Sequence, residues 1–153
     1  MEQTAFGGCS RPDPLYGPAA VTGLSHVEIY VSELSRSVEF WGWLLPQLGF
    51  APYQEWESGK SWKSDSTYLV FVQAESPYSG EPFHRKRPGI NHLAFWAEST
   101  DEVEALTREL RARGVRILYD DRDPREIGAP SAYAVYFEDP DRIKVEIVVR
   151  EES

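Results

Sequence analysis

Two stretches, "GLSHVEIYVS" at residues 23–32 and "GINHLAFWAE" at residues 89–98, follow one pattern. Each begins with glycine and an aliphatic residue, continues with a small polar residue and a histidine, and ends in a strand-like run of alternating side chains. His26 of the first stretch therefore corresponds to His92 of the second, at an offset of 66 residues. This repetition predicts one structural unit that occurs twice in the chain.

A helical pattern follows each of these strands. In the first copy, apolar side chains recur at helical spacing at Leu34, Val38, Trp41 and Leu45. In the second copy they recur at Val103, Leu106 and Leu110. Pro46 and Gly49 are expected to end the first helix. Ser99 and Glu102 are spaced as a capping box, and Gly114 marks the end of the second helix.

Three strand-like pieces follow each helix, so each half is predicted to be a βαβββ module and the fold class is α+β. The pieces are "FAPYQEW", "KSWKSD" and "TYLVFVQ" in the first copy, and "RILYDD", "AYAVYF" and "RIKVEIVV" in the second. We expect modules at about residues 22–75 and 88–150, within one domain of residues 22–150. A polar connector rich in turn formers joins them, and residues 1–21 are predicted to be an irregular arm.

The composition excludes several classes of protein. The chain has 153 residues and a formal net charge of −9, which disfavours binding to nucleic acid or to an anionic membrane surface. Its single cysteine, Cys9, permits neither an internal disulfide nor a zinc site built from cysteines. There is no apolar run long enough to span a membrane and no signal-peptide pattern at the start. We therefore expect a cytoplasmic protein.

Alternate side chains of a strand share a face, which groups the candidate residues. His26, Glu28 and Tyr30 are predicted to share one face of the first strand, with the apolar alternates packed on a helix. His92 and Trp96 take the matching face of the second strand. The two histidines are therefore expected to lie on the faces of their sheets that point away from the helices.

A carboxylate completes this set. Glu146 lies between Val145 and Ile147 in the last strand and is predicted to face with the histidines. A carboxylate in such surroundings is costly to bury unless it is paired or binds a metal. Two imidazoles and one carboxylate suit a divalent cation with open coordination positions, such as Fe, Mn, Zn, Ni or Co, with one ion per chain. Hydrogen-bonded structural histidines are the alternative, because the three residues form no local motif.

With these residues in view, the chain resembles the vicinal oxygen chelate superfamily. That superfamily includes glyoxalase I, extradiol dioxygenases, fosfomycin-modifying transferases and bleomycin-resistance proteins. The resemblance spans about residues 22–150 and rests on "LSHVEIYVSELSRSVEFW", "RPGINHLAFWAES", "GVRIL" and "YFEDPDRIKVEIV". It implies that the two modules form an eight-stranded, open, barrel-like cleft, paired either within one chain or by exchange across a homodimer.

The resemblance also implies a ligand set of His26, His92 and Glu146. A fourth ligand of the glyoxalase I type would lie in "TYLVFVQ", where Val70 falls at the place of Glu146 and cannot bind a metal. The three-ligand pattern is similar to that of extradiol dioxygenases and fosfomycin transferases. Glu146 and Glu28 are the candidate catalytic carboxylates, with Glu28 as a possible fourth ligand or base. The candidate pocket residues are Tyr30, Trp62, Tyr68 and Trp96.

Two functions remain open at this stage. One is a divalent-metal-dependent enzyme of dioxygenase, lyase, isomerase or transferase type that acts on a small oxygen-chelating substrate. The other is a metal-free protein that binds a small molecule or sequesters a drug, like the bleomycin-resistance members. The acidic charge and abundant aromatic residues would suit a cationic aromatic ligand in the second case.

Overall fold

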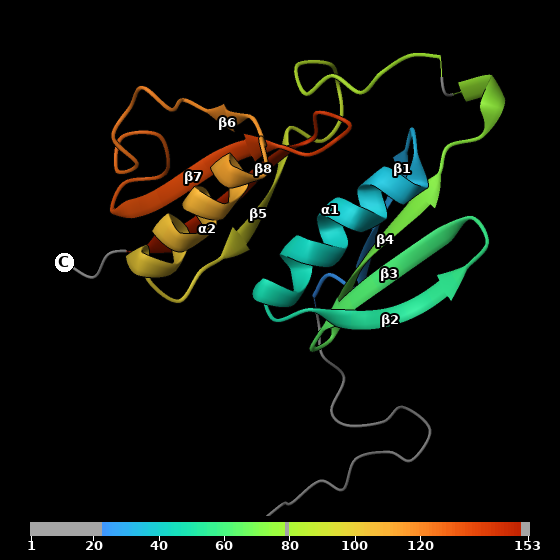
Figure 1. Ribbon diagram of the computed structural model, residues 1–153, viewed down its shortest axis with the longest axis horizontal. Coiled ribbons are helices and arrows are strands. Elements are labelled where there is room, and N and C mark those ends of the chain that lie inside the picture. Colours follow the sequence, from blue (N-terminus) through green and yellow to red (C-terminus); the bar gives the residue numbers. More distant parts are fainter. Residues whose placement is uncertain (1–22, 79, 151–153) are drawn as a thin grey trace, which may run out of the picture.

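A computed structural model describes residues 23–78 and 80–150, so the predicted N-terminal arm and Cys9 lie outside the described residues. The described residues form two βαβββ modules in succession, as the sequence predicts, and the fold class is α+β (Figure 1).

The first module contains β1 (His26–Val31), α1 (Leu34–Gln47), β2 (Ala51–Trp56), β3 (Gly59–Ser64) and β4 (Thr67–Gln73). Its strands form one sheet in the order β1-β4-β3-β2. β1 runs parallel to β4, because α1 carries the chain back across the sheet, while the other pairs are antiparallel hairpin neighbours. A short 3-10 helix, η1 (Ser76–Tyr78), begins the connector.

The second module repeats this arrangement. It contains β5 (His92–Trp96), α2 (Thr100–Ala112), β6 (Ile117–Leu118), β7 (Ala132–Glu138) and β8 (Lys144–Arg150). The sheet order is β5-β8-β7-β6, with β5 parallel to β8. β6 is only two residues long, and the long loop after it borders one face of β7.

Both modules begin at a glycine for a conformational reason. Gly23 has φ 153° and Gly89 has φ 137°, a backbone region that side-chain-bearing residues rarely adopt. The glycine that opens each repeat therefore has the same role in both modules: it sets the entry of the chain into β1 and β5.

The helix boundaries agree with the sequence to within a residue or two. α1 keeps Pro46 inside its last turn and ends at Gln47. The predicted capping box of α2 is confirmed: the Ser99 Oγ accepts from the Glu102 N–H at 3.2 Å. The Glu102 carboxylate in turn accepts from the backbone N–H of Glu98 at 2.6 Å.

One hydrophobic core spans both modules. Trp41 of α1 is fully buried, stacks on Phe71 of the first sheet and contacts Phe95 of the second. Its indole Nε1 donates to the buried Asp139 carboxylate of the second module at 3.1 Å. The turn that contains Asp139 also receives a hydrogen bond from the first module, from the Ser32 N–H to the Asp141 carboxylate at 2.8 Å.

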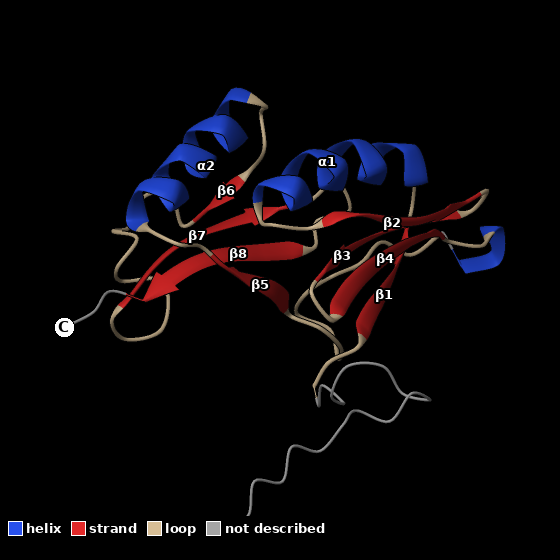
Figure 2. Ribbon diagram, turned by 90° about the horizontal axis from the view of Figure 1, so that it is seen from below, coloured by secondary structure: helices blue, strands red, loops and turns tan. Residues whose placement is uncertain are grey.

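Both helices lie on the same side of the molecule, and the strands lie below them (Figure 2). The strand residues that pack into the shared core include Val27, Ile29, Leu93, Phe95, Val145 and Ile147. The alternate residues, which include both histidines and Glu146, therefore occupy the opposite faces. The two four-stranded sheets share no hydrogen-bonded edge within the described part of one chain, so the cleft is not closed there. Among the described helices, none has the length and apolar character needed to cross a membrane.

Candidate functional site

β5 and β8 bring His92 and Glu146 into direct contact. The His92 Nε2 lies 2.9 Å from a Glu146 carboxylate oxygen, and Glu146 is buried while His92 is one-third exposed. The other ring nitrogen, Nδ1, lies 2.8 Å from the Asn91 Oδ1. An Nδ1–H that donates to this oxygen directs the Nε2 toward Glu146 and fixes the ring.

Tyr136 of β7 is the third member of this cluster. It pairs in register with Glu146 across β7 and β8, and a hydrogen bond joins its hydroxyl to the Glu146 carboxylate. Burial, followed by this hydrogen bond and the charge of Glu146, raises the pKa of the Tyr136 hydroxyl above its usual value. Tyr136 therefore stays a neutral donor that holds Glu146 in place.

His26 has a matching environment in the first module. It is exposed, and its ring stacks on Tyr68 with 4.6 Å between centroids. Its Nδ1 lies 3.3 Å from the hydroxyl of the preceding residue, Ser25, as the Nδ1 of His92 lies next to Asn91. In both modules the polar residue before the histidine therefore engages Nδ1 and leaves Nε2 for another partner.

One chain does not bring all three predicted ligands together. Within residues 23–78 and 80–150, there is no group of three His, Cys, Asp or Glu side chains that could hold a metal ion. His92 and Glu146 are paired, and His26 lies on the other sheet.

The register of the sheets makes Val70 the structural counterpart of Glu146. Glu28 of β1 pairs with Val70 of β4, while Ala94 of β5 pairs with Glu146 of β8. The carboxylate of the first module is thus on β1 and that of the second is on β8. Glu28 is exposed on the open face, at the position that Ala94 occupies in the second module.

The predicted pocket residues divide between two environments. Tyr68 stacks on His26, and Tyr30 and Trp96 lie on the open faces with 59% and 65% of their surface exposed. Trp62 is only 2% exposed and packs edge-on against Phe71 in the core. This placement does not support a pocket role for Trp62, because its ring lies on the helix side of the sheet.

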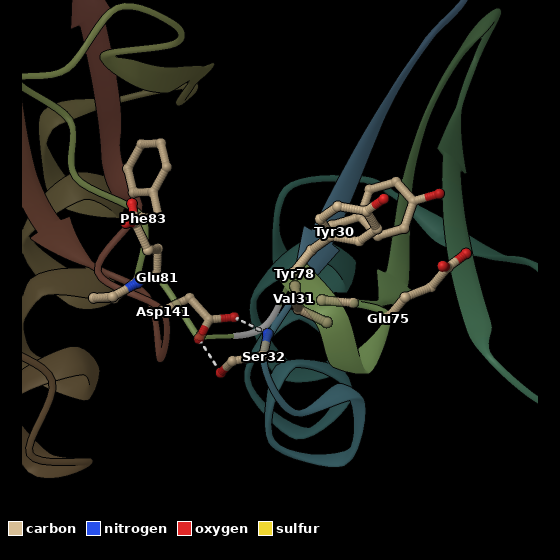
Figure 3. Close-up of a pocket in the computed structure, with 10 residues that line it drawn as sticks. Tyr30, Val31, Ser32, Glu75, Tyr78, Glu81, Phe83 and Asp141 are labelled. Carbon is tan, nitrogen blue, oxygen red and sulfur yellow. Dashed lines mark hydrogen bonds between the residues drawn. The ribbon is translucent and has the colours of Figure 1, made fainter.

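A cavity lies where the two modules meet, at the end of β1 remote from His26. It measures about 700 Å³, and its lining includes Tyr30, Glu75, Tyr78, Glu81, Phe83 and Asp141. Phe83 lies on one side of it, Tyr30 and Tyr78 lie on the other, and the hydrogen bonds between Ser32 and Asp141 run between the modules (Figure 3). No lysine or arginine of the described chain is among its lining residues.

Sequence reasoning did not identify Tyr136 or Tyr119 as neighbours of the site. The Lys144 ammonium lies 4.2 Å from the centroid of the Tyr136 ring and 5.2 Å from that of Tyr119. Strand parity places Lys144 on the face of Glu146, which it precedes by two residues, and the register with His92 agrees. The turn "EDPDR" at residues 138–142 connects β7 to β8, and its Asp139 and Asp141 also join the two modules.

Comparison with known proteins identifies the family. The sequence profile of the Glyoxalase/Bleomycin resistance protein/Dioxygenase superfamily matches residues 23–147. The chain belongs to this superfamily. The match confirms the resemblance found in the sequence and covers both modules of the glyoxalase-type fold.

Two relatives are more than half identical to the chain. The uncharacterized protein YqjT of Bacillus subtilis is 54% identical over 125 residues, which are 82% of this chain and 97% of YqjT. A solved structure from Bacillus halodurans, described as a candidate glyoxalase, is 56% identical with a TM-score of 0.79, over 82% of this chain and 93% of that one. The fosfomycin resistance protein FosX of Listeria monocytogenes shares the fold, with a TM-score of 0.60 and 22% identity over 84% of this chain and 93% of FosX.

Proposed function

We propose that this glyoxalase-superfamily protein is a divalent-metal-dependent enzyme that acts on a small oxygen-chelating substrate. The observation that carries the proposal is the contact between the His92 Nε2 and the buried Glu146 carboxylate at 2.9 Å on the open face. A buried carboxylate beside a histidine, in a superfamily with metal-dependent members, is the donor pair from which a metal centre is built.

The surroundings of this pair suit a metal. Asn91 engages one nitrogen of His92 and Tyr136 holds Glu146, which are the outer contacts that orient metal ligands in proteins. His92 and Glu146 would hold the ion, and the ion would act as a Lewis acid toward oxygen atoms of the substrate. Glu28, exposed on the open face, is the proposed proton-transfer group.

We propose that His26 reaches this pair from a second copy of the chain. The two sheets of one chain stay separate, and β1 and β5 are edge strands that carry exposed aromatic residues, Tyr30 and Trp96. Exposed edges and aromatic surface of this kind usually mark an interface. A two-fold homodimer would then cover both edges and supply His26 to the partner's His92 and Glu146.

A complementation experiment tests metal binding and the exchange of modules together. His26→Ala and Glu146→Ala chains are co-expressed with two different histidine-free tags, and the doubly tagged dimer is isolated. One of its two sites then combines an intact His26 with an intact His92 and Glu146. We expect it to bind about half the metal of the wild-type dimer, whereas each variant alone binds little.

Three outcomes would count against the proposal. A doubly tagged dimer as metal-free as the single variants would contradict exchange between chains. A wild-type protein that stays free of metal after incubation with Fe(II), Mn, Zn, Ni and Co salts would contradict the metal enzyme itself. A monomer in solution that still binds metal would place all ligands in one chain.

The cavity between the modules favours a second candidate function, the binding of an organic cation. Tyr30, Tyr78 and Phe83 supply aromatic faces, and Glu75, Glu81 and Asp141 supply negative charge. Titration calorimetry of metal-free protein with phenyltrimethylammonium would test this function. Saturable binding that is lost in Tyr30→Ala would support a sequestering protein, and unchanged binding in that variant would exclude this cavity.

A further inference from the structure

The open face of the second module carries Lys144, whose side chain has no ion pair among residues 23–78 and 80–150. Lys144 alternates with Glu146 along β8 and pairs in register with His92, so its side chain leaves the sheet beside the candidate site. Within the described part of the chain its ammonium makes neither a hydrogen bond nor an ion pair, and it lies over the rings of Tyr136 and Tyr119. Glu146, the carboxylate on the same strand face, is engaged by His92 and Tyr136.

Two arginines extend this positive face. The Arg122 guanidinium lies 5.8 Å from the centroid of the Tyr119 ring, which also contacts Lys144. Arg150, on the same face of β8 as Lys144, lies 5.4 Å from the Trp96 ring. Neither arginine side chain pairs with a carboxylate among the described residues. A cation that lies over an aromatic ring keeps its N–H donors free for another partner.

The protein has 25 acidic and 16 basic residues, and several basic side chains pair with carboxylates, Lys60 with Glu55, for example, at 2.8 Å. Glu138 alone contacts three arginines. Lys144 is partly buried, and an anion bound beside it would supply a counter-charge that no ion pair supplies among the described residues.

The first module presents a related arrangement. Lys63 of β3 lies in register with Tyr68, which in turn lies in register with His26. The Lys63 ammonium lies 5.0 Å from the Tyr53 ring centroid and likewise has no carboxylate partner among the described residues. Each histidine therefore lies in one row of its sheet with a lysine that contacts a tyrosine.

We propose that the face around His92 and Glu146 binds an oxyanion, a carboxylate, phosphate or phosphonate group, through the Lys144 ammonium. If the bound anion is the substrate, it is an anionic compound whose neighbouring oxygens approach the His92–Glu146 pair, and this part of the inference rests on the proposed function. The anion site itself does not depend on a metal.

Titration calorimetry with inorganic phosphate, on the full chain freed of metal with a chelator, tests the site directly. We expect saturable binding that weakens about tenfold in Lys144→Met, because a hydrogen bond to a charged group is lost. Lys144→Arg keeps the charge and should retain binding, which separates the effect from misfolding. Lys60→Met is the matched control, because Lys60 also lies over a ring, that of Trp62, but is paired with Glu55.

The metal content of the same variants is measured in parallel, so that the two proposals fail separately. Equal phosphate affinity in wild type and Lys144→Met, or no saturable binding to wild type, overturns the anion site whatever the metal content. Phosphate binding that depends on Lys144 in a protein that takes up no metal supports the anion site and contradicts the enzyme. Metal content in Lys144→Met should equal that of wild type.

Discussion

Tyr136 and Glu146 face each other across β7 and β8, and the tyrosine hydroxyl is hydrogen-bonded to the carboxylate. This contact fixes the orientation of the buried Glu146 while His92 approaches its other side. Residues in such an outer position act on a metal through the ligand that they hold. Tyr136 is therefore a positioning residue in the proposed site.

Tyr136→Phe removes this hydrogen bond without changing the shape of the ring. If Glu146 is a ligand, we expect metal affinity to fall roughly 10- to 100-fold, measured by competition with a chromogenic chelator. Tyr119→Phe is the control, because Tyr119 contacts the Tyr136 ring edge-on while Tyr136, and not Tyr119, is hydrogen-bonded to Glu146. Equal affinity in wild type and Tyr136→Phe would show that Glu146 needs no such support.

The raised pKa of Asp139 predicts that this residue stabilises the fold more at acidic than at neutral pH. Burial raises the pKa of this carboxyl from 3.8 to about 6, although hydrogen bonds from the Ile143 and Asp141 N–H groups and from Trp41 oppose the shift. The folded chain therefore binds this proton at a higher pH than the unfolded chain does. The contribution of protonated Asp139 to stability is complete below pH 3.8 and is lost as the pH rises through about 6.

Urea unfolding at two pH values measures this contribution. Between about pH 7.5 and about pH 5, Asp139 should add about 1 kcal/mol to the free energy of unfolding of the wild type. In Asp139→Asn this gain on acidification should disappear, although the variant is less stable overall. An identical pH dependence in both proteins would assign the effect to other groups.

The pKa of Glu138 is shifted in the opposite direction from that of Asp139, so its effect on stability has the opposite pH dependence. Burial opposes its ionisation, but the hydrogen bond from Arg85 and the charges of Arg142, Arg85 and Arg116 outweigh burial and lower the pKa of the carboxyl. Its stabilisation is therefore present above the ordinary value of 4.5 and is lost as the pH falls through the lowered pKa.

Glu138→Gln should lower the free energy of unfolding by about 2 kcal/mol near neutral pH, less than for a fully buried pair because Arg116 and Arg142 can reach water. The control is Glu81→Gln, which breaks the exposed pair with Arg87 and should cost less than about 0.5 kcal/mol. Chemical denaturation measures both. A loss in Glu138→Gln no greater than in Glu81→Gln would contradict the role of the arginine cluster.

Ser99 should contribute to stability through the start of α2. Ser99→Ala leaves the Glu102 N–H without its acceptor, and we expect a loss of about 1 kcal/mol in thermal or urea unfolding. Ser35→Ala, in the first turn of α1, is a matched control because its hydroxyl bonds only the exposed Glu33 side chain. Similar losses in the two variants would mean that the capping box adds nothing specific.

The sequence repeat predicts most of the fold and part of the candidate site. Strand parity and the 66-residue offset correctly placed His26, His92 and Glu146 on open faces and made Val70 the counterpart of Glu146. These features depend on local alternation, which a single sequence contains.

The features that the sequence did not predict depend on contacts between distant segments. Trp62 is flanked by Ser61 and Lys63 in a strand with one large apolar residue, so only the position of the core decides which way its ring points. All seven residues of β7 are buried, so alternation could not indicate that Tyr136 faces Glu146. The two sheets are separate and share one core that includes Trp41 of α1, an arrangement that no local pattern contains.

The hydrogen bond from Trp41 to Asp139 couples the stability of the two modules. Each half taken alone would expose part of a core that includes Trp41, Phe71 and Phe95, and the Trp41 indole or Asp139 would lose its partner. We therefore expect that neither repeat unit folds independently, despite their matching topology. We expect halves produced as separate peptides to stay unfolded alone and to assemble when mixed, and the intact chain to unfold in one cooperative step.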